Sequence, residues 1–194
     1  VSAGHTDATY SEMQTAVSLG VRQTTHTFNG MRGFNHREPG ALGAALEMKE
    51  LTCELIADKI HVHPAAIRLL VTAKGLERVI LVTDSLSGTG MPDGTIMMQG
   101  QRVRYANGEA RLQDGTLAGS LLTMDQALKN LAEVTGIPIE KCWICSSKNA
   151  AVSIGFGRRK GALRAGMDSD LVLLDSNLQV EKTIVQGEVV FERQ

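Results

Sequence analysis

Short apolar segments alternate with helix-like segments through the first 85 residues, and this alternation constrains the fold more than any other feature of the chain. The segments rich in β-branched or apolar residues, which we predict to be strands, are residues 1–5, 21–28, 51–57 and 78–83. The segments with apolar side chains at helical spacing are residues 8–19, 40–50 and 64–75. Strands that alternate with helices are typical of parallel βα units, so the sequence predicts an α/β fold.

The pattern changes after Asp93. Short extended pieces separated by Gly or Asn-Gly turns predict a β-hairpin insertion at about residues 93–118. Helices are expected at about 122–135 and 139–154, and the tail from Gly161 reads as several short strands. The two predicted units are residues 1–158 and, as a small β subdomain, residues 159–194.

The composition is that of a globular protein, since 43% of the 194 residues are hydrophobic and a chain of this length can bury a sizeable core. Twenty Lys+Arg against 21 Asp+Glu give a net charge of -1, which argues against general binding to nucleic acid or anionic lipid. No apolar run reaches the length that crosses a bilayer, and the first residues lack the pattern of a signal peptide. We therefore expect a cytoplasmic protein with no nucleic-acid or membrane partner.

The chain has three cysteines, Cys53, Cys142 and Cys145. An odd number in a domain of ordinary size does not resemble a secreted disulfide framework, so we expect reduced thiols. Cys142 and Cys145 have the spacing of a redox or zinc motif. However, no second pair completes a four-thiolate site and no strand leads into the motif. The simpler interpretation is two part-buried helical cysteines.

Titratable side chains lie at or just after the ends of four successive predicted strands: His5, His26, His61 and Asp84. The carboxyl ends of parallel strands face one side of the sheet, where functional groups gather. Two imidazoles and a carboxylate suit a divalent metal such as zinc. Each residue alone has a simpler explanation, a core or surface histidine or, for Asp84, a cap of the following loop. Their shared placement favours the metal site.

Six ordered strings carry a resemblance to a known family. They are GHTDAT at 4–9, THTFNGM at 25–31, REPG at 37–40, ADKIHVHP at 57–64, VTDS at 82–85 and LAGS at 117–120. Together they resemble the motifs of the N-acetylglucosamine-6-phosphate deacetylases of the amidohydrolase superfamily, and KGALRAGMDSDLVLLD at 160–175 is similar to the closing segment of many amidohydrolases. The resemblance implies the second half of a (β/α)8 TIM-like barrel over residues 1–158 and strands of a small β-sandwich subdomain over 159–194.

The same resemblance implies roles for residues at the strand ends. His5 and His26 match metal ligands, and the metal would be zinc, with iron, manganese or cobalt as alternatives. Asp84 matches the catalytic acid/base, and His61 matches a histidine that contacts the sugar and helps polarise the amide carbonyl. The implied reaction hydrolyses the acetamide of N-acetylglucosamine 6-phosphate with a metal-activated water, in amino-sugar catabolism.

Other matched positions would bind the phosphorylated amino sugar. They are Asn29, Gly30, Arg37, Leu117, Ala118 and Gly119, in addition to His61. A planar guanidinium at Arg37 suits the 6-phosphate, although a surface ion pair with Glu38 explains it equally well without the motif. His36 and His63 lie beside motif positions and are interpreted as surface residues.

Family members carry a further N-terminal half with early barrel strands and a metal-ligating glutamate, which no part of the 194 residues matches. We therefore expect a truncated chain that binds metal poorly and is essentially inactive alone, with unpaired sheet edges that favour association. By resemblance the protein is a homodimer. Two alternatives stay open: an amidohydrolase acting on a different N-acetyl amino sugar or cyclic amide, and a non-catalytic half-domain that needs a partner chain.

Overall fold

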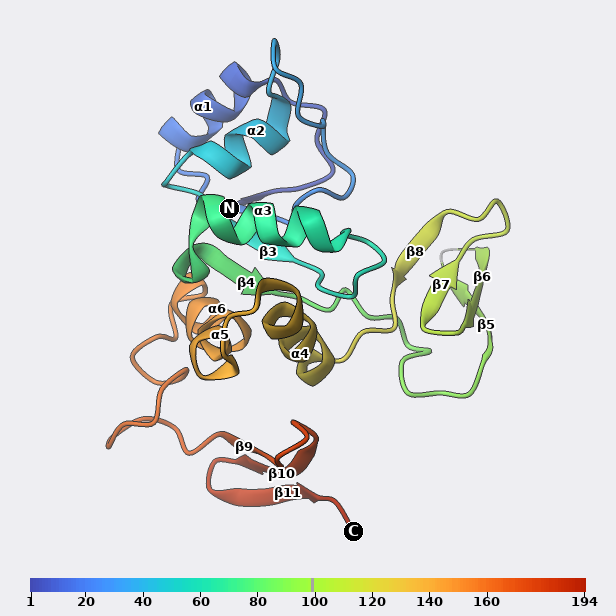
Figure 1. Cartoon of the computed structure of the whole chain (residues 1–194), viewed down its shortest axis with the longest axis vertical. Coiled ribbons are helices and arrows are strands. Elements are labelled where there is room, and N and C mark those ends of the chain that lie inside the picture. Colours follow the sequence, from blue (N-terminus) through green and yellow to red (C-terminus); the bar gives the residue numbers. More distant parts are fainter. Residues whose placement is uncertain (99) are drawn as a thin grey trace.

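A parallel four-stranded sheet organises the first part of the chain in the computed structural model, which describes residues 1–98 and 100–194 (Figure 1). Its strands, in spatial order, are β1 (Ser2–Ala3), β2 (Gln23–Thr24), β3 (Thr52–Leu55) and β4 (Val79–Leu81). Neighbours in sequence are therefore neighbours in space, as expected for successive βα units. The predicted α/β class is confirmed.

Three helices connect these strands: α1 (Tyr10–Ser18), α2 (Gly40–Glu47) and α3 (Pro64–Lys74). The side chain of Thr9 accepts a hydrogen bond from the Glu12 N–H while Glu12 bonds back to the Thr9 N–H, a capping box that starts α1. Pro64 stands in the first turn of α3, where its missing N–H costs nothing, and Gly75 ends that helix at φ +69°. All three predicted helices are present within a few residues of their expected bounds.

The strand predicted for residues 21–28 is wrong in its length, because β2 contains only Gln23 and Thr24. His26 and Phe28 have φ values of +29° and +84°, which turn the backbone out of the extended conformation. The apolar and β-branched residues of this segment predict a longer strand, but the left-handed residues end it.

A second sheet occupies the place of the predicted hairpin. Its strands are β5 (Gly94–Met98), β6 (Gln101–Ala106), β7 (Glu109–Arg111) and β8 (Leu117–Ser120), paired antiparallel in that order. Asn107 and Gly108, with φ values of +53° and +80°, make the turn between β6 and β7. The hairpin expected at 93–118 is therefore a four-stranded sheet that continues to Ser120. The Asn-Gly turn adds the pairing of β6 with β7, and β8 then adds a pairing with β7.

The chain then forms α4 (Met124–Thr135), α5 (Ile139–Ser146) and α6 (Lys148–Ser153). The single helical segment expected at 139–154 is thus two helices, because Ser147 leaves the helical conformation at φ -142° and ψ -63°. Buried side chains of β3 and β4 pack with those of α3, α4 and α5 in the main core, which includes Leu55, Ile67 and Leu131. In the described part of the chain, no helix is long and apolar enough to cross a bilayer.

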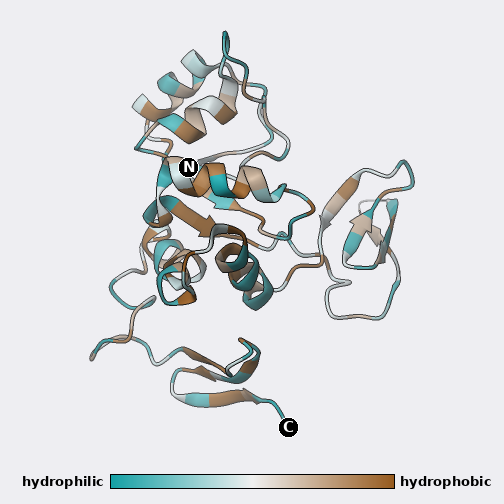
Figure 2. Ribbon diagram, viewed as in Figure 1, coloured by the Kyte–Doolittle hydropathy of each residue, from teal (hydrophilic) through white to brown (hydrophobic). Residues whose placement is uncertain are grey.

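The tail folds into a three-stranded antiparallel sheet of β9 (Leu171–Leu174), β10 (Val180–Val185) and β11 (Glu188–Glu192). This confirms the predicted short strands. Hydrophobic residues recur along the strands of this sheet (Figure 2). Val190 and Phe191 are 60% and 48% exposed, and exposed apolar surface of this kind favours association.

Candidate metal and catalytic site

Parallel register brings His5 and His26 together. Ala3 pairs with Thr24 across β1 and β2, and each histidine lies two residues beyond its paired strand residue. Their Nε2 atoms are 3.0 Å apart, and the rings meet edge to face with centroids 4.7 Å apart at 88°. Two imidazoles from separate strand ends therefore point their Nε2 atoms at the same place.

Three of the predicted site residues hold a left-handed backbone. The φ values are +45° at His5, +29° at His26 and +49° at Asp84. Residues other than glycine seldom adopt positive φ, each instance costs on the order of 1–3 kcal/mol, and such residues cluster at functional sites. The strain at three of the four strand ends is a structural reason to regard this edge of the sheet as functional.

The turn after His26 is held from two sides. The backbone N–H of His26 donates to Oε2 of Glu54 on β3 at 3.3 Å. The backbone carbonyl of His26 accepts from the N–H and from Nδ2 of Asn29, at 3.0 and 3.1 Å. Nδ1 of His26 is buried without a hydrogen-bond partner in the described structure. Buried polar atoms usually have a hydrogen-bond partner, so this ring nitrogen is an exception among the described residues.

Gly30 lies directly against the ring of His5. A Cβ built on Gly30 would stand 2.6 Å from Nδ1 and 2.9 Å from Cε1 of His5, and the residue has φ +60°. Only glycine fits this contact without displacing the imidazole. The structure thus gives Gly30 a role in seating His5, while its predicted contact with substrate stays a prediction.

His61 lies in the loop after β3, beside Asp58. Nδ1 of His61 is 2.5 Å from Oδ2 of Asp58, and the two side chains are 8% and 7% exposed. Oδ1 of Asp58 accepts hydrogen bonds from the backbone N–H groups of Ile60 and His61, both at 2.8 Å. A buried carboxylate therefore organises the whole loop around His61.

Asp84 follows β4 and joins the parallel sheet to the end of β8. Its carbonyl accepts a hydrogen bond from the Ser120 N–H at 2.9 Å, and Leu86 donates to the Ser120 carbonyl at 3.0 Å. Gly119 packs here with φ +92°, where a Cβ would stand 2.9 Å from Leu86 and 3.1 Å from the Asp84 carbonyl oxygen. The predicted residues Leu117, Ala118 and Gly119 thus form the strand that abuts the Asp84 loop.

Arg37 lies apart from these groups in an exposed loop, where its N–H donates to Oδ1 of Asn35 at 3.0 Å. Its neighbour Glu38 instead accepts from the N–H groups of Tyr10 and Gly40 at 2.8 and 3.0 Å. Across the described residues no ion pair joins Arg37 to Glu38, so that alternative is wrong. The guanidinium of Arg37 remains available, and its predicted phosphate contact stays a prediction.

Sequence reasoning missed two carboxylates that support the site, Asp58 and Glu54. Asp58 stands three residues before His61 in a loop, a spacing that allows an aspartate to accept backbone hydrogen bonds from the residues that follow. That signal was available in the sequence. Glu54 had no comparable signal, because its bond to the His26 N–H depends on the pairing of β2 with β3.

Residues 1–190 match the amidohydrolase family. The match includes His5 and His26, whose Nε2 atoms meet at the strand ends. The chain belongs to the amidohydrolase family. The N-acetylglucosamine-6-phosphate deacetylase of Lysinibacillus sphaericus is 42% identical over 189 residues, which are 97% of this chain and 49% of the relative. The N-acetylgalactosamine-6-phosphate deacetylase of Escherichia coli O157:H7 is 39% identical over 189 residues, 97% of this chain and 50% of the relative.

A solved structure agrees with this amidohydrolase assignment. The N-acetylglucosamine-6-phosphate deacetylase of Thermotoga maritima superposes with a TM-score of 0.95 at 41% identity, over 99% of this chain and 53% of that protein. The chain therefore spans about half the length of the relatives that it matches.

The histidine pair of this amidohydrolase fits part of a zinc site. Two nitrogens bound to tetrahedral zinc at about 2.05 Å lie about 3.3 Å apart, close to the 3.0 Å between the two Nε2 atoms. Among residues 1–98 and 100–194, no group of three or more His, Cys, Asp or Glu side chains is arranged to hold a metal. The pair offers at most two nitrogens to a metal, whereas catalytic zinc sites have three ligands from protein.

The cysteines contribute no ligand to the amidohydrolase site. Cys53, Cys142 and Cys145 are free and fully buried, and the thiols of Cys142 and Cys145 face the carbonyls of Ile137 and Leu76. Burial raises the pKa of Cys142, and raises the pKa of Cys145 to about 12. Cys142 and Cys145 lie in α5, as the simpler interpretation predicted, but they are fully buried and not part-buried.

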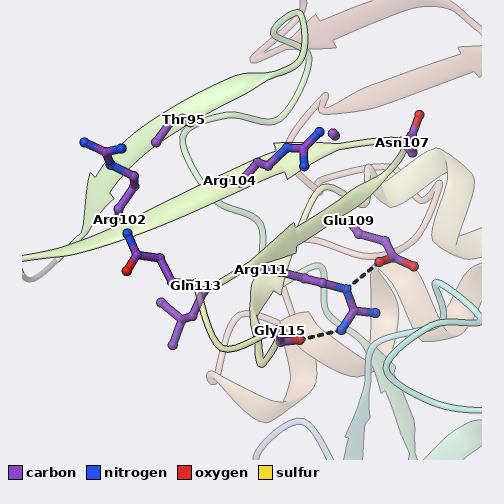
Figure 3. Close-up of a pocket in the computed structure, with 10 residues that line it drawn as sticks. Thr95, Arg102, Arg104, Asn107, Glu109, Arg111, Gln113 and Gly115 are labelled. Carbon is purple, nitrogen blue, oxygen red and sulfur yellow. Dashed lines mark hydrogen bonds and ion pairs between the residues drawn. The ribbon is translucent and has the colours of Figure 1, made fainter.

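Concave surface occurs elsewhere on the molecule. A depression of about 540 Å³ lies on the β5–β8 sheet, lined by Arg102, Arg104, Glu109 and Arg111 among others (Figure 3). It contains none of the predicted site residues. The strand-end groups instead lie along an open edge of the sheet, where His5 and Asp84 are exposed.

Proposed function

We propose that this chain carries the catalytic edge of a metal-dependent deacetylase that converts N-acetylglucosamine 6-phosphate and water to glucosamine 6-phosphate and acetate. The observation that carries the proposal is the meeting of His5 and His26 at 3.0 Å on adjacent strand ends, in a chain 42% identical to a protein of that name. His61 and Asp84 follow the next two strands of the same parallel sheet.

The proposed architecture is the second half of a (β/α)8 barrel over residues 1–158 with part of a small β-sandwich over 159–194. Parallel strands in sequential order with intervening helices support the barrel half. In such barrels the catalytic groups occupy the carboxyl ends of the strands, which is where His5, His26 and Asp84 stand. From the same resemblance we propose a cytoplasmic homodimer.

His5 and His26 would hold the metal through Nε2, with zinc as the first choice and iron, manganese or cobalt as alternatives. When bound, a divalent cation makes water a stronger acid and polarises a carbonyl group. We propose that a third ligand, the glutamate of the family pattern, completes the site. The 194 residues alone should therefore hold metal weakly and turn over slowly.

Asp84 would move the protons of the reaction. Its carboxylate accepts a proton as the water oxygen attacks the acetamide carbonyl, and returns it to the nitrogen as the C–N bond breaks. The acetic acid formed in this step gives its remaining water proton to the amine, so acetate and a protonated amine leave and both atoms and charge balance. His61 would contact the sugar and the amide carbonyl, where developing negative charge needs stabilisation.

The remaining predicted residues would select a phosphorylated amino sugar. The unpaired guanidinium of Arg37 suits a phosphate, to which it presents forked donors. Asn29 and Gly30 border the histidine pair, and Leu117, Ala118 and Gly119 border Asp84. The sugar would lie between these two groups, with its acetamide toward the histidines.

A second candidate substrate is N-acetylgalactosamine 6-phosphate, because a relative of that name is 39% identical over nearly the whole chain. The two sugars differ only in the configuration of one hydroxyl. Side-by-side rates of acetate release from the two sugar phosphates decide between them.

The test is acetate release from N-acetylglucosamine 6-phosphate by the purified protein, with its intact mass measured alongside and zinc added or removed. We expect the slow, metal-dependent release by the 194 residues to fall at least ~100-fold in Asp84→Asn and to be unaffected in Asp93→Asn, an exposed aspartate outside the site. Equal release from N-acetylglucosamine without phosphate, or release that survives Asp84→Asn, would contradict the proposal.

A further inference from the structure

The loop after β3 is built around one buried carboxylate. Oδ1 of Asp58 accepts from the backbone N–H groups of Ile60 and His61 at 2.8 Å, and Oδ2 lies 2.5 Å from Nδ1 of His61. The two oxygens therefore have separate tasks. One holds the backbone and the other faces the imidazole, in a place where both side chains are less than 10% exposed.

Asp58 is ionised at neutral pH in spite of its burial. Burial alone would raise the pKa of this carboxyl, but the hydrogen bonds from the His61 ring and from the two backbone N–H groups outweigh it and lower the pKa. An ionised carboxylate only accepts hydrogen bonds. Nδ1 of His61 must therefore carry a hydrogen.

Nε2 of His61 is the ring nitrogen that remains free to contact a ligand. Within the described residues, Nε2 of His61 makes no hydrogen bond, and it is not among the side-chain atoms cut off from solvent without a partner. Because Nδ1 is occupied, the state of Nε2 alone decides what His61 offers to a ligand.

We propose that Asp58 is a positioning residue that fixes the hydrogen of His61 on Nδ1, so that Nε2 acts as an acceptor in the neutral ring and as a donor only in the imidazolium. What Nε2 meets rests on the proposed deacetylase function. A sugar hydroxyl can donate to the neutral ring, whereas an amide carbonyl can be polarised only by the charged one.

Replacing Asp58 by asparagine gives a sharp prediction. The two backbone N–H groups require an acceptor at the Oδ1 position, so the amide oxygen must lie there and the NH2 group must take the Oδ2 position. That NH2 group then donates to Nδ1 of His61, which has to give up its hydrogen. The neutral ring of Asp58→Asn should carry its hydrogen on Nε2, the reverse of the wild-type arrangement.

His63 supplies an internal reference in the same molecule. Its Nδ1 accepts a hydrogen bond from the Ala65 N–H at 3.2 Å at the start of α3, so its neutral ring must carry the hydrogen on Nε2. His61 and His63 should therefore show opposite tautomers in the wild-type chain, and the same tautomer in Asp58→Asn.

The experiment is long-range 1H–15N NMR of the 194-residue chain labelled with 15N-histidine, at a pH where the rings are neutral. We expect Nδ1–H for His61 and Nε2–H for His63 in the wild type, and Nε2–H for both in Asp58→Asn. The wild-type spectrum is a test by itself if the variant does not fold. Nε2–H at His61 in the wild type, or Nδ1–H in a folded Asp58→Asn, would overturn the proposal.

Acetate release separates this inference from the proposed function. With the tautomer reversed, kcat in the acetate assay should fall on the order of 100-fold with a smaller change in KM. Unchanged kcat in a variant whose tautomer is reversed would overturn the role of Asp58 toward substrate. If the wild-type protein neither binds nor hydrolyses any N-acetyl amino sugar phosphate, the proposed function fails while the tautomer measurement still decides what Asp58 does.

Discussion

Nε2 of His5 and Nε2 of His26 lie 3.0 Å apart although 21 positions separate the residues in the chain. The contact follows from the pairing of Ala3 with Thr24, which brings the two strand ends level, and from positive φ at both histidines, which turns each ring toward the other.

Zinc binding should depend on both members of this pair. We expect His5→Ala and His26→Ala each to weaken zinc binding at least ~10-fold, because each removes one of the two nitrogens. Competition with a chromophoric chelator measures the affinity. His36→Ala, which changes an exposed histidine outside the site, is the control and should bind as the wild type does. Equal losses in all three variants would rule out the pair as the binding site.

Gly30→Ala should disturb His5 as well as the backbone. An added Cβ stands 2.6 Å from the imidazole, so either the ring or the turn must move. The matched control is Gly136→Ala, which has a similar φ of +68° but no atom within 4 Å of the added carbon. Both variants bear the left-handed penalty of about 1–2 kcal/mol. Only Gly30→Ala should lose about 1–3 kcal/mol more, the cost of overpacking, in the free energy of unfolding measured in urea, or bind zinc more weakly.

Stability should fall at alkaline pH because of Cys145. Burial raises the pKa of this thiol to about 12, whereas an unfolded cysteine titrates near pH ~8.5. Between these values the folded chain keeps a proton that the unfolded chain releases, so the free energy of unfolding drops as pH rises, by about 1.4 kcal/mol per pH unit. Urea unfolding at pH 8, 9 and 10 measures the slope.

Cys145→Ala isolates this contribution from other groups that titrate in the same range. The variant starts from a lower stability because it loses a buried side chain, but its free energy should fall less steeply with pH than that of the wild type. Parallel pH profiles for the two proteins would mean that Cys145 titrates normally in the fold.

Arg104→Thr should stabilise the β5–β8 sheet. Arg104 lies directly opposite Arg111 on β7 and opposite Thr95 on β5, so the substitution removes a like-charge pair and creates a Thr–Thr pair (Figure 3). The expected gain is about 0.2–1 kcal/mol at low salt, smaller at high salt where the charges are screened. Arg102→Thr is the control, because its partner on β5 is the uncharged Met97. A gain that does not change with salt would contradict the like-charge explanation.

Local features of the sequence determined the α/β class, the helix positions and the placement of His5, His26, His61 and Asp84 after strands. The capping box of Thr9 and Glu12 and the proline at the start of α3 act within one turn of helix, so a short window of sequence is enough to find them. The segments of β3 and β4 were also recognisable from a short window, because buried strands are rich in apolar residues.

Only the tertiary structure decided which of these groups touch. The left-handed turn at His26 shortens β2, the pairing of β2 with β3 brings Glu54 to the His26 N–H, and the fold of one loop joins Asp58 to His61. The tertiary structure also decided the pairing of the four-stranded β5–β8 sheet and the contact between His5 and Gly30. Contacts of this kind depend on pairing between segments that are distant in the chain and on single backbone angles, and neither leaves a periodic pattern in the residues themselves.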